Sequence, residues 1–244
     1  MASDRDAGAE LARADLEYAF DRSALRPATK IDVLSGGREA FPSMLTAIAA
    51  ARRLVCLETY ILRSDTTGRR FAAALAERAR AGVPVRLLFD GMGGRGIDAE
   101  YLDELRRAGV EIAVYNPILP FGHRFGLGRL ARRDHRKILV VDSSVGFTGG
   151  INIADDYAGE EEGGGGWFDV HVRVEGPIVA ELLRLFRHSW VRARGRPFRL
   201  PEPIASAQPL VPVAFATSLV TRTFRPRMEI RRAYLHAIGQ AKRT

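Results

Sequence analysis

One short stretch of the sequence holds residue types that could transfer a phosphoryl group, His135-x-Lys137-x-x-x-x-Asp142. Alternate residues of an extended chain face the same side about 6–7 Å apart, so His135 and Lys137 are expected to point the same way. An imidazole can attack phosphorus, and an ammonium can neutralise the charge that builds on the non-bridging oxygens in the transition state. The pair therefore predicts phosphodiester chemistry.

A second pattern follows closely, Gly149-Gly150-x-Asn152, where a predicted strand runs into a loop. Glycine lets the backbone approach a phosphate closely, and the amide of Asn152 can donate a hydrogen bond to it. The two patterns together favour a phosphate site more strongly than either does alone.

Apolar periodicity predicts the elements that must position these residues. Strands are expected at 31–34, 54–62, 83–89, 111–115, 137–142, 145–148 and 167–174, and helices at 40–53, 70–82, 98–108 and 177–190. This alternation is typical of an α/β domain with a mixed, largely parallel sheet flanked by helices on both faces.

The chain divides into four predicted regions. A lead-in (1–29) with a short helix at 8–20 precedes the main domain (30–195), and a proline-rich linker (196–212) precedes a last segment (213–244). Leu45–Arg53 recurs as Leu235–Arg243, where six of nine positions match when Arg52 is paired with Lys242. We interpret the last segment as the start of a second, truncated repeat. Two amphipathic helices of similar composition are the alternative.

Composition narrows the class of partner. Lys plus Arg exceeds Asp plus Glu, 37 − 29 = +8, which favours anionic partners such as phospholipid headgroups, nucleic acid or phosphate esters without choosing among them. Cys56 is the single cysteine, so no intrachain disulfide can form. No apolar run reaches the roughly 18 residues of a membrane span, and the acidic N-terminus is unlike a secretory signal. A cytoplasmic chain that meets lipid only from the surface is expected.

The sequence around these motifs resembles that of a known family, the phospholipase D superfamily, with its HxKxxxxD and G[GS]xN signatures. Arg133–Asp142 and Gly146–Ala154 are specifically similar to the cardiolipin synthase branch, and so are Glu58–Ile61, Gly82–Leu88 and Trp167–His171. The resemblance covers about residues 30–243 and implies a phospholipase D-like sandwich fold.

The resemblance also implies roles for individual residues. His135 would form a phosphohistidine intermediate, while Lys137 and Asn152 would hold the phosphate oxygens. Asp169 would accept the second imidazole N–H of His135 and raise its pKa. Asp142 would be structural, a buried carboxylate satisfied by nearby donors.

Further residues carry weaker expectations. Gly149 and Gly150 belong to the structural part of the motif, and Glu58, Arg133 and Arg136 are candidate substrate-binding residues. His171 is read as a packed strand histidine in preference to a site residue. His123, His188 and His236 are read as surface or helix residues. The basic stretch 122–137 is either a solvated loop or a lip that rests on anionic lipid.

No cofactor and no metal are expected. The spacing of the His and Asp residues matches no zinc-ligand pattern, and Lys137 would repel a cation. The resemblance likewise implies a metal-independent mechanism.

The leading function is transfer of a phosphatidyl group from one phospholipid to an alcohol such as phosphatidylglycerol or glycerol. Water as the acceptor would make the protein a phospholipase D, and the sequence does not separate the two. A metal-independent homodimeric nuclease and a lipid-binding half-domain without activity are the alternatives. Nucleic acid is the less favoured partner, because Phe125 is the one aromatic residue among the cations of 122–137.

The mechanism that the resemblance implies needs two His/Lys pairs, one to attack and one to protonate the leaving alcohol. The sequence holds one such pair. The 190-residue offset of the repeat would place the counterpart of His135 at about position 325. The chain is therefore expected to be incomplete and inactive by itself. Homodimerisation, which would also bring two pairs together, is the rival expectation.

Overall fold

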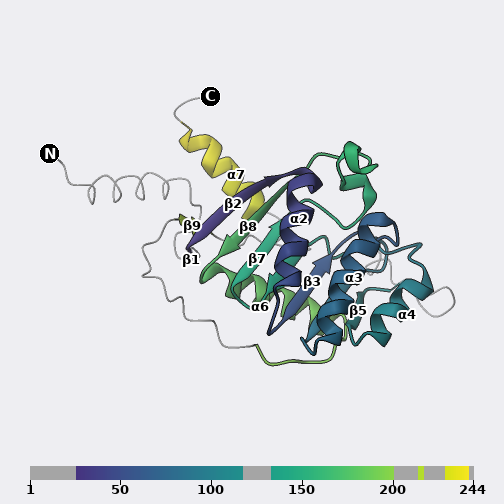
Figure 1. Ribbon diagram of the computed structural model, residues 1–244. Coiled ribbons are helices and arrows are strands. Elements are labelled where there is room, and N and C mark those ends of the chain that lie inside the picture. Colours follow the sequence, from purple (N-terminus) through teal and green to yellow (C-terminus); the bar gives the residue numbers. More distant parts are fainter. Residues whose placement is uncertain (1–25, 118–132, 201–213, 217–228, 242–244) are drawn as a thin grey trace, which may run out of the picture.

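The computed structural model describes residues 26–117, 133–200, 214–216 and 229–241 (Figure 1). The helix expected at 8–20, most of the basic stretch 122–137 and most of the linker 196–212 lie outside these residues. Among the described residues, no helix has both the length and the apolar character needed to cross a bilayer.

A seven-stranded sheet forms the centre of the molecule, in the order β2-β8-β7-β6-β3-β4-β5. Its strands are β2 (Lys30–Ser35), β3 (Val55–Thr59), β4 (Val85–Asp90), β5 (Glu111–Tyr115), β6 (Ile138–Val141), β7 (Val145–Gly149) and β8 (Val170–Glu175). Each matches a strand that the sequence predicts. The bounds of β5 are as predicted, and the other strands have a shifted end.

The sheet is mixed, as expected, but the prediction that it is largely parallel is wrong. Only β3–β4 and β4–β5 are parallel pairs, and the other four neighbouring pairs are antiparallel. Parallel neighbours need a crossover connection, whereas β6 returns directly into β7 through a turn with Asp142 (φ 52°) and Ser143 (φ 59°) in the left-handed region. The helix–strand alternation that favours parallel pairing stops at β5.

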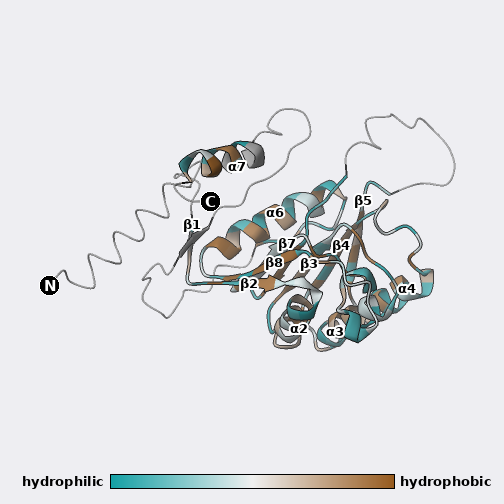
Figure 2. Cartoon of the chain, turned by 90° about the horizontal axis from the view of Figure 1, so that it is seen from above, coloured by the Kyte–Doolittle hydropathy of each residue, from teal (hydrophilic) through white to brown (hydrophobic). Residues whose placement is uncertain are grey.

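Helices cover both faces of the sheet, as predicted (Figure 2). On one face lie α2 (Gly36–Ala49), α3 (Thr66–Arg80) and α4 (Ala99–Arg107), and on the other lies α6 (Ile178–Arg192). Side chains alternate between these faces along each strand, so Val55 and Leu57 of β3 join the core under α2 and α3 while Cys56 joins the core under α6. The two faces are called the α2 face and the α6 face below.

Local capping explains two shifted boundaries. Helix α2 begins at Gly36, four residues before the predicted start, because the Glu39 carboxylate accepts the Ser35 N–H at 2.8 Å and caps the first turn. Strand β3 ends at Thr59, three residues early, where the Thr59 hydroxyl donates to the Ile61 carbonyl at 2.9 Å. The chain then leaves the sheet, and this departure shapes the site described next.

A smaller pairing joins the two ends of the described chain. Strand β1 (Arg26–Ala28) pairs antiparallel with β9 (Ala214–Ala216), and helix α7 (Glu229–Gln240) follows. The α7 side chains of Tyr234, Leu235 and Ile238 are more than half exposed. A helix thus exists at the predicted repeat, and the four-region division of the chain stays a prediction.

Candidate functional site

His135 lies on a short extended segment, residues 133–137, that leads into β6. The Asp134 N–H donates to the Asp90 carboxylate at 2.9 Å, and the Asp134 carboxylate accepts the Arg136 N–H at 3.3 Å. These two bonds hold the backbone on either side of His135, so they fix how the segment presents its exposed side chain. The strand predicted to start at Lys137 starts at Ile138 instead.

The imidazole of His135 lies against the ammonium of Lys137. Lys137 Nζ is 3.2 Å from His135 Nδ1 and donates to the His135 carbonyl at 2.9 Å. The Tyr60 ring completes the cluster, with its centroid 4.7 Å from that of His135 and 5.3 Å from Lys137 Nζ. Because Nδ1 faces Lys137, Nε2 is the nitrogen left to meet a substrate. Lys137 is only 4% exposed.

Burial and mutual repulsion shift the pKa values of this pair downwards. The pKa of His135 is lowered by burial and by the charge of Lys137, which outweigh the carboxylates of Asp134, Asp90 and Asp169. Asp169 raises the pKa of His135, as expected, but burial and Lys137 lower it by more. Burial lowers the pKa of Lys137 to about 8. At neutral pH the site thus holds a neutral imidazole beside a cation.

Gly150 and Asp169 fit against each other. A methyl group on Gly150 would stand 2.1 Å from both carboxylate oxygens of Asp169, so only glycine leaves room for that carboxylate. Asp169 accepts the Val170 N–H at 2.7 Å and makes no hydrogen bond to His135. The bond that the resemblance implies is absent, and Asp169 acts on His135 and Lys137 through its charge.

Asn152 is buried and engaged with the protein. Its Oδ1 accepts the Ile61 N–H at 2.9 Å, and its Nδ2 donates to the Tyr157 hydroxyl at 2.7 Å. The bond to Ile61 ties the loop after β7 to the chain that leaves β3, and the bond to Tyr157 lies within that loop. One Nδ2 hydrogen remains for a ligand, so the phosphate-binding role of Asn152 stays a proposal.

Asp142, the last residue of the motif, binds only backbone. Its carboxylate accepts the N–H groups of Arg52 (2.9 Å), Arg53 (2.7 Å) and Leu54 (2.9 Å). Asp142 is half-buried and lies at the far end of β6 from His135. These contacts are those of a residue that shapes the connection between α2 and β3.

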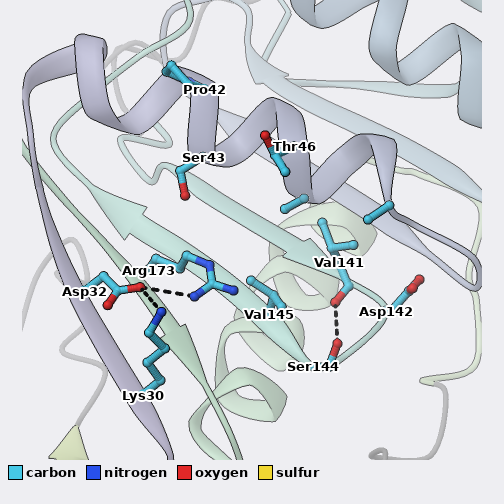
Figure 3. A pocket seen from close by; sticks show the side chains of 12 residues that line it. Lys30, Asp32, Pro42, Ser43, Thr46, Val141, Asp142, Ser144, Val145 and Arg173 are labelled. Carbon is cyan, nitrogen blue, oxygen red and sulfur yellow. Dashed lines mark hydrogen bonds and ion pairs between the residues drawn. The ribbon is translucent and has the colours of Figure 1, made fainter.

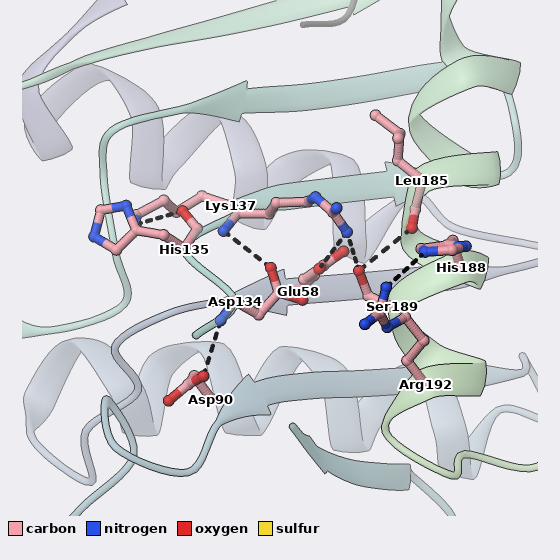
Figure 4. A network of polar contacts seen from close by, with 10 residues as sticks. Glu58, Asp90, Asp134, His135, Lys137, Leu185, His188, Ser189 and Arg192 are labelled. Carbon is pink, nitrogen blue, oxygen red and sulfur yellow. Dashed lines mark hydrogen bonds and ion pairs between the residues drawn. The ribbon is translucent and has the colours of Figure 1, made fainter. Parts of the chain in front are cut away.

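A cluster on the α6 face, called the acidic anchor here, holds the same segment from the opposite side (Figure 4). Its members are Glu58, Asp90, Asp134, Arg136 and Ser189. Glu58 is 1% exposed, its Oε1 lies 3.8 Å from Arg136 Nη1, and Arg136 also bonds Ser189 of α6. Burial and the nearby Asp134 raise the pKa of Glu58 well above its usual value.

The candidate substrate-binding residues all lie in or beside this anchor. Arg133 donates to Asp90 at 3.3 Å and to the Asn116 carbonyl at 3.0 Å. Arg136 pairs with Glu58 and donates to Ser189 of α6. The charged groups of Glu58, Arg133 and Arg136 thus have partners within the protein. The contacts point to an anchoring role for all three.

His171 is buried in β8, with 1% of its surface exposed, as expected for a packed strand histidine. Neither of its ring nitrogens has a hydrogen-bond partner. Burial lowers its pKa to about 4, which keeps the ring neutral. The residues around His135 on the α2 face are called the reactive face below. They are His135, Lys137, Gly149, Asp169 and His171.

Sequence reasoning missed two features. Tyr60 belongs to the Glu58–Ile61 stretch that resembles the family, and no residue-type signal separates it from an ordinary strand tyrosine. Trp167 and Phe168 are 59% and 75% exposed beside Asp169, although the alternating pattern predicts a strand there. Among the described residues, no group of three His, Cys, Asp or Glu side chains could hold a metal.

A hollow of about 710 Å³ lies beside α2, lined in part by Lys30, Asp32, Asp142 and Arg173 (Figure 3). Asp32 is paired there with both Lys30 (3.0 Å) and Arg173 (3.1 Å). The hollow is at the opposite end of β6 from His135. The residues predicted to do chemistry do not line it.

Comparison with known proteins decides the family. Residues 44–190, which include every member of the reactive face, match the family described as "Cardiolipin synthase, PLD-like domain". The chain belongs to this family. It is 36% identical over 188 residues to a cardiolipin synthase of Geobacillus sp. (strain WCH70), which covers 77% of this chain and 37% of that protein. It is also 36% identical over 180 residues to one of Halalkalibacterium halodurans, covering 73% and 35%.

The chain thus spans about a third of the length of these curated relatives. Two solved structures share its fold at low identity. NucT of Helicobacter pylori matches with a TM-score of 0.52 and 16% identity over 69% of this chain and 99% of that one. The phospholipase D family member Nuc of Salmonella typhimurium matches with 0.50 and 17% over 70% and 100%. The predicted phospholipase D-like α/β fold is confirmed.

Proposed function

We propose that the chain carries one catalytic unit of a phosphatidyltransferase of the cardiolipin synthase type. The observation that carries the proposal is the solvent-facing imidazole of His135 with the Lys137 ammonium 3.2 Å away, on a segment that the family match includes. Neutral His135 is a nucleophile, and Lys137 is a cation held where phosphoryl charge would build.

The chemistry follows in two steps. In the first, Nε2 of His135 bonds to phosphorus, the bond to the leaving alcohol oxygen breaks, and that oxygen takes a proton from an acid. In the second, an acceptor alcohol gives its proton to the base that this acid has become and attacks phosphorus, and the bond to His135 breaks. Lys137 balances the charge of the non-bridging oxygens in both transition states. A phospholipid is the donor, and water as the acceptor would give hydrolysis.

The acid of the first step has to come from outside the reactive face. Attack and leaving group lie on opposite sides of phosphorus, so a single imidazole serves both poorly. We propose that a second phospholipase D-like unit supplies it, either a further repeat, of which 213–244 would be the beginning, or a second copy of this chain. The one-third share of the relatives' length supports the first of these.

A membrane surface is the proposed place of action, on the cytoplasmic side. Trp167 and Phe168 directly precede Asp169 and are exposed, and aromatic side chains suit the boundary between water and lipid. The net charge of +8 favours anionic headgroups. Both features would also suit nucleic acid, so the substrate class needs a direct test.

The test uses a donor that does not need the missing acid. p-Nitrophenol leaves without protonation, so phosphatidyl-p-nitrophenol in mixed micelles should react with this chain alone, in EDTA. We expect a burst of one p-nitrophenolate per chain and a phosphatidyl adduct on His135 by mass spectrometry. His135→Asn should abolish the burst, and His188→Asn, a change at an exposed histidine of α6, should leave it intact.

Two outcomes would contradict the proposal. A burst that survives in His135→Asn would remove His135 as the nucleophile. A burst with thymidine 5′-p-nitrophenyl phosphate but none with the lipid donor would favour the nuclease. Phosphatidylglycerol vesicles then separate the acceptors for the assembled enzyme, because cardiolipin indicates transfer and phosphatidic acid indicates hydrolysis.

A further inference from the structure

Three residues of the reactive face stand in a row, Lys137 just before β6, Gly149 at the end of β7 and His171 on β8. Gly149 of β7 is paired with His171 of β8, and Thr148 is paired with Ile138 of β6. Lys137 precedes Ile138, so it stands level with Gly149 on the other side. Directly paired residues share a face. His171 and Lys137 therefore flank a position that has no side chain.

His171 leans over this gap. A methyl group on Gly149 would stand 2.8 Å from His171 Nδ1, so that nitrogen occupies the space above the glycine. Neither ring nitrogen has a partner, although both are enclosed. Most buried polar groups are hydrogen-bonded, and a buried imidazole without a partner calls for an explanation. The ring is close enough to Lys137 for the ammonium charge to lower the pKa of His171.

The contact between Lys137 and His135 cannot persist when His135 Nδ1 carries a proton, so Lys137 then needs a second hydrogen-bond acceptor. Its ammonium lies 3.2 Å from His135 Nδ1, and an ammonium can only donate there, which leaves the ring proton on Nε2. Attack through Nε2 needs the other tautomer, in which the ring has lost its Nε2 proton to water and gained one on Nδ1. Two donors then face each other, and the ammonium has to turn away.

We propose that His171 is a positioning residue for Lys137, whose ammonium donates to His171 Nδ1 across Gly149 when His135 carries its proton on Nδ1. The ammonium keeps one N–H on the His135 carbonyl and turns another to His171, which leaves the third for a phosphate oxygen. The mechanistic purpose rests on the proposed function, but the contact itself does not. The charged or aromatic groups that act on Lys137 are His135, Asp134, Asp169, His171 and Tyr60.

The test follows Lys137 by NMR in the lipid-free His135→Leu chain, in which no His135 Nδ1 competes for the ammonium, so its result is independent of turnover. We expect adding His171→Leu, which removes the acceptor, to lower the pKa of Lys137 by about one unit from its value in the His135→Leu chain, because a charged hydrogen bond is lost. His171→Gln, whose carbonyl can accept, should change it by a few tenths of a unit at most. His188→Leu is the matched control and should change nothing.

A second spectrum separates the hydrogen bond from a change in polarity. The ¹⁵N resonance of His171 Nδ1 should move when Lys137→Met removes the donor. Equal Lys137 pKa values with and without His171→Leu in the His135→Leu chain, or a His171 resonance that Lys137→Met leaves unmoved in that chain, would overturn the proposal and leave His171 a packing residue. If His171→Leu does not fold, the Lys137→Met spectrum decides alone.

Discussion

The segment 133–137 has two sides that differ in almost every physical respect. On the α2 face, His135 and Lys137 keep polar atoms free for a ligand, and a cation and a neutral ring lie close together. On the α6 face, the carboxyl groups of Asp134 and Glu58 are enclosed. Glu58 pairs with the guanidinium of Arg136, and Asp134 accepts the Arg136 backbone N–H. Because side chains alternate along an extended stretch, neighbouring residues point to opposite faces and have different roles.

The difference shows how the protein separates chemistry from folding. A nucleophile has to stay accessible to its substrate, so its side chain is not fully buried and contributes little to the free energy of unfolding. Its position then depends on groups that are not accessible, and the acidic anchor supplies them through the backbone of Asp134 and Arg136. Removing a residue from one side should therefore affect activity, and removing its neighbour should affect stability.

The largest expected effect is on stability, from Arg136→Met. This change keeps the apolar stem and removes the guanidinium, so the buried carboxyl group of Glu58 loses its cation and Ser189 loses its partner. Breaking a buried charge cluster in this way should lower the free energy of unfolding by about 3 kcal/mol, measured by urea denaturation at pH 7.

His135→Asn is the matched variant, one residue earlier on the other face. It should change the free energy of unfolding by less than about 0.5 kcal/mol, because the side chain is exposed. If the two variants prove equally stable, the segment is not divided between anchoring and chemistry as described.

A plot of kcat/KM against pH for the assembled enzyme should be bell-shaped, and its two limbs should report the pKa values of His135 and Lys137. The pKa of free His135 is lowered below 6.5, so protonation should reduce the rate only on the acid side of that value. The pKa of Lys137 is about 8, so loss of the ammonium should reduce the rate above pH 8.

Lys137→Arg tests the alkaline side. A guanidinium stays charged at every pH of the assay, so this variant should be slower but should lose the decline above pH 8. A wild-type profile that stays flat from pH 7.5 to 9 would show that the Lys137 charge does not contribute to catalysis.

Sequence reasoning was strongest where a residue's type defines its chemistry. His135 and Lys137 are predicted together and are found together, and all seven strands are predicted because apolar periodicity follows from burial on a sheet face. Strand direction was the failure. Periodicity gives the face of a residue but carries no signal for whether the next strand returns through a turn or a crossover.

The roles of Glu58, Arg133 and Arg136 show a second kind of failure. A charged residue beside a catalytic motif suggests substrate contact, yet alternation places Arg136 and Glu58 on the α6 face. Arg133 is in phase with His135, but its guanidinium pairs with Asp90. The signal was present in the spacing, since Arg136 lies one residue out of phase with His135 and Lys137. What the sequence could not give was the partner, because Ser189 and Glu58 come to this segment only through the tertiary fold.

The smallest expected effect concerns Glu58, whose pKa in the folded chain is raised well above 4.5 by burial and by Asp134. The folded state therefore holds a proton that the unfolded state releases above pH 4.5. Glu58 weakens stability as pH rises from that value towards its folded pKa, and the loss is complete above it. Glu58→Gln cannot ionise, and its amide can still donate to Asp134. The variant should match the wild type near pH 4.5 and be the more stable chain at pH 8, by urea denaturation at both values. The same change at the exposed Glu104 of α4 is the control and should leave the pH dependence unaltered. Parallel stability curves for wild type and Glu58→Gln would mean that Glu58 is ionised in the fold, and that Arg136 outweighs Asp134 in the acidic anchor.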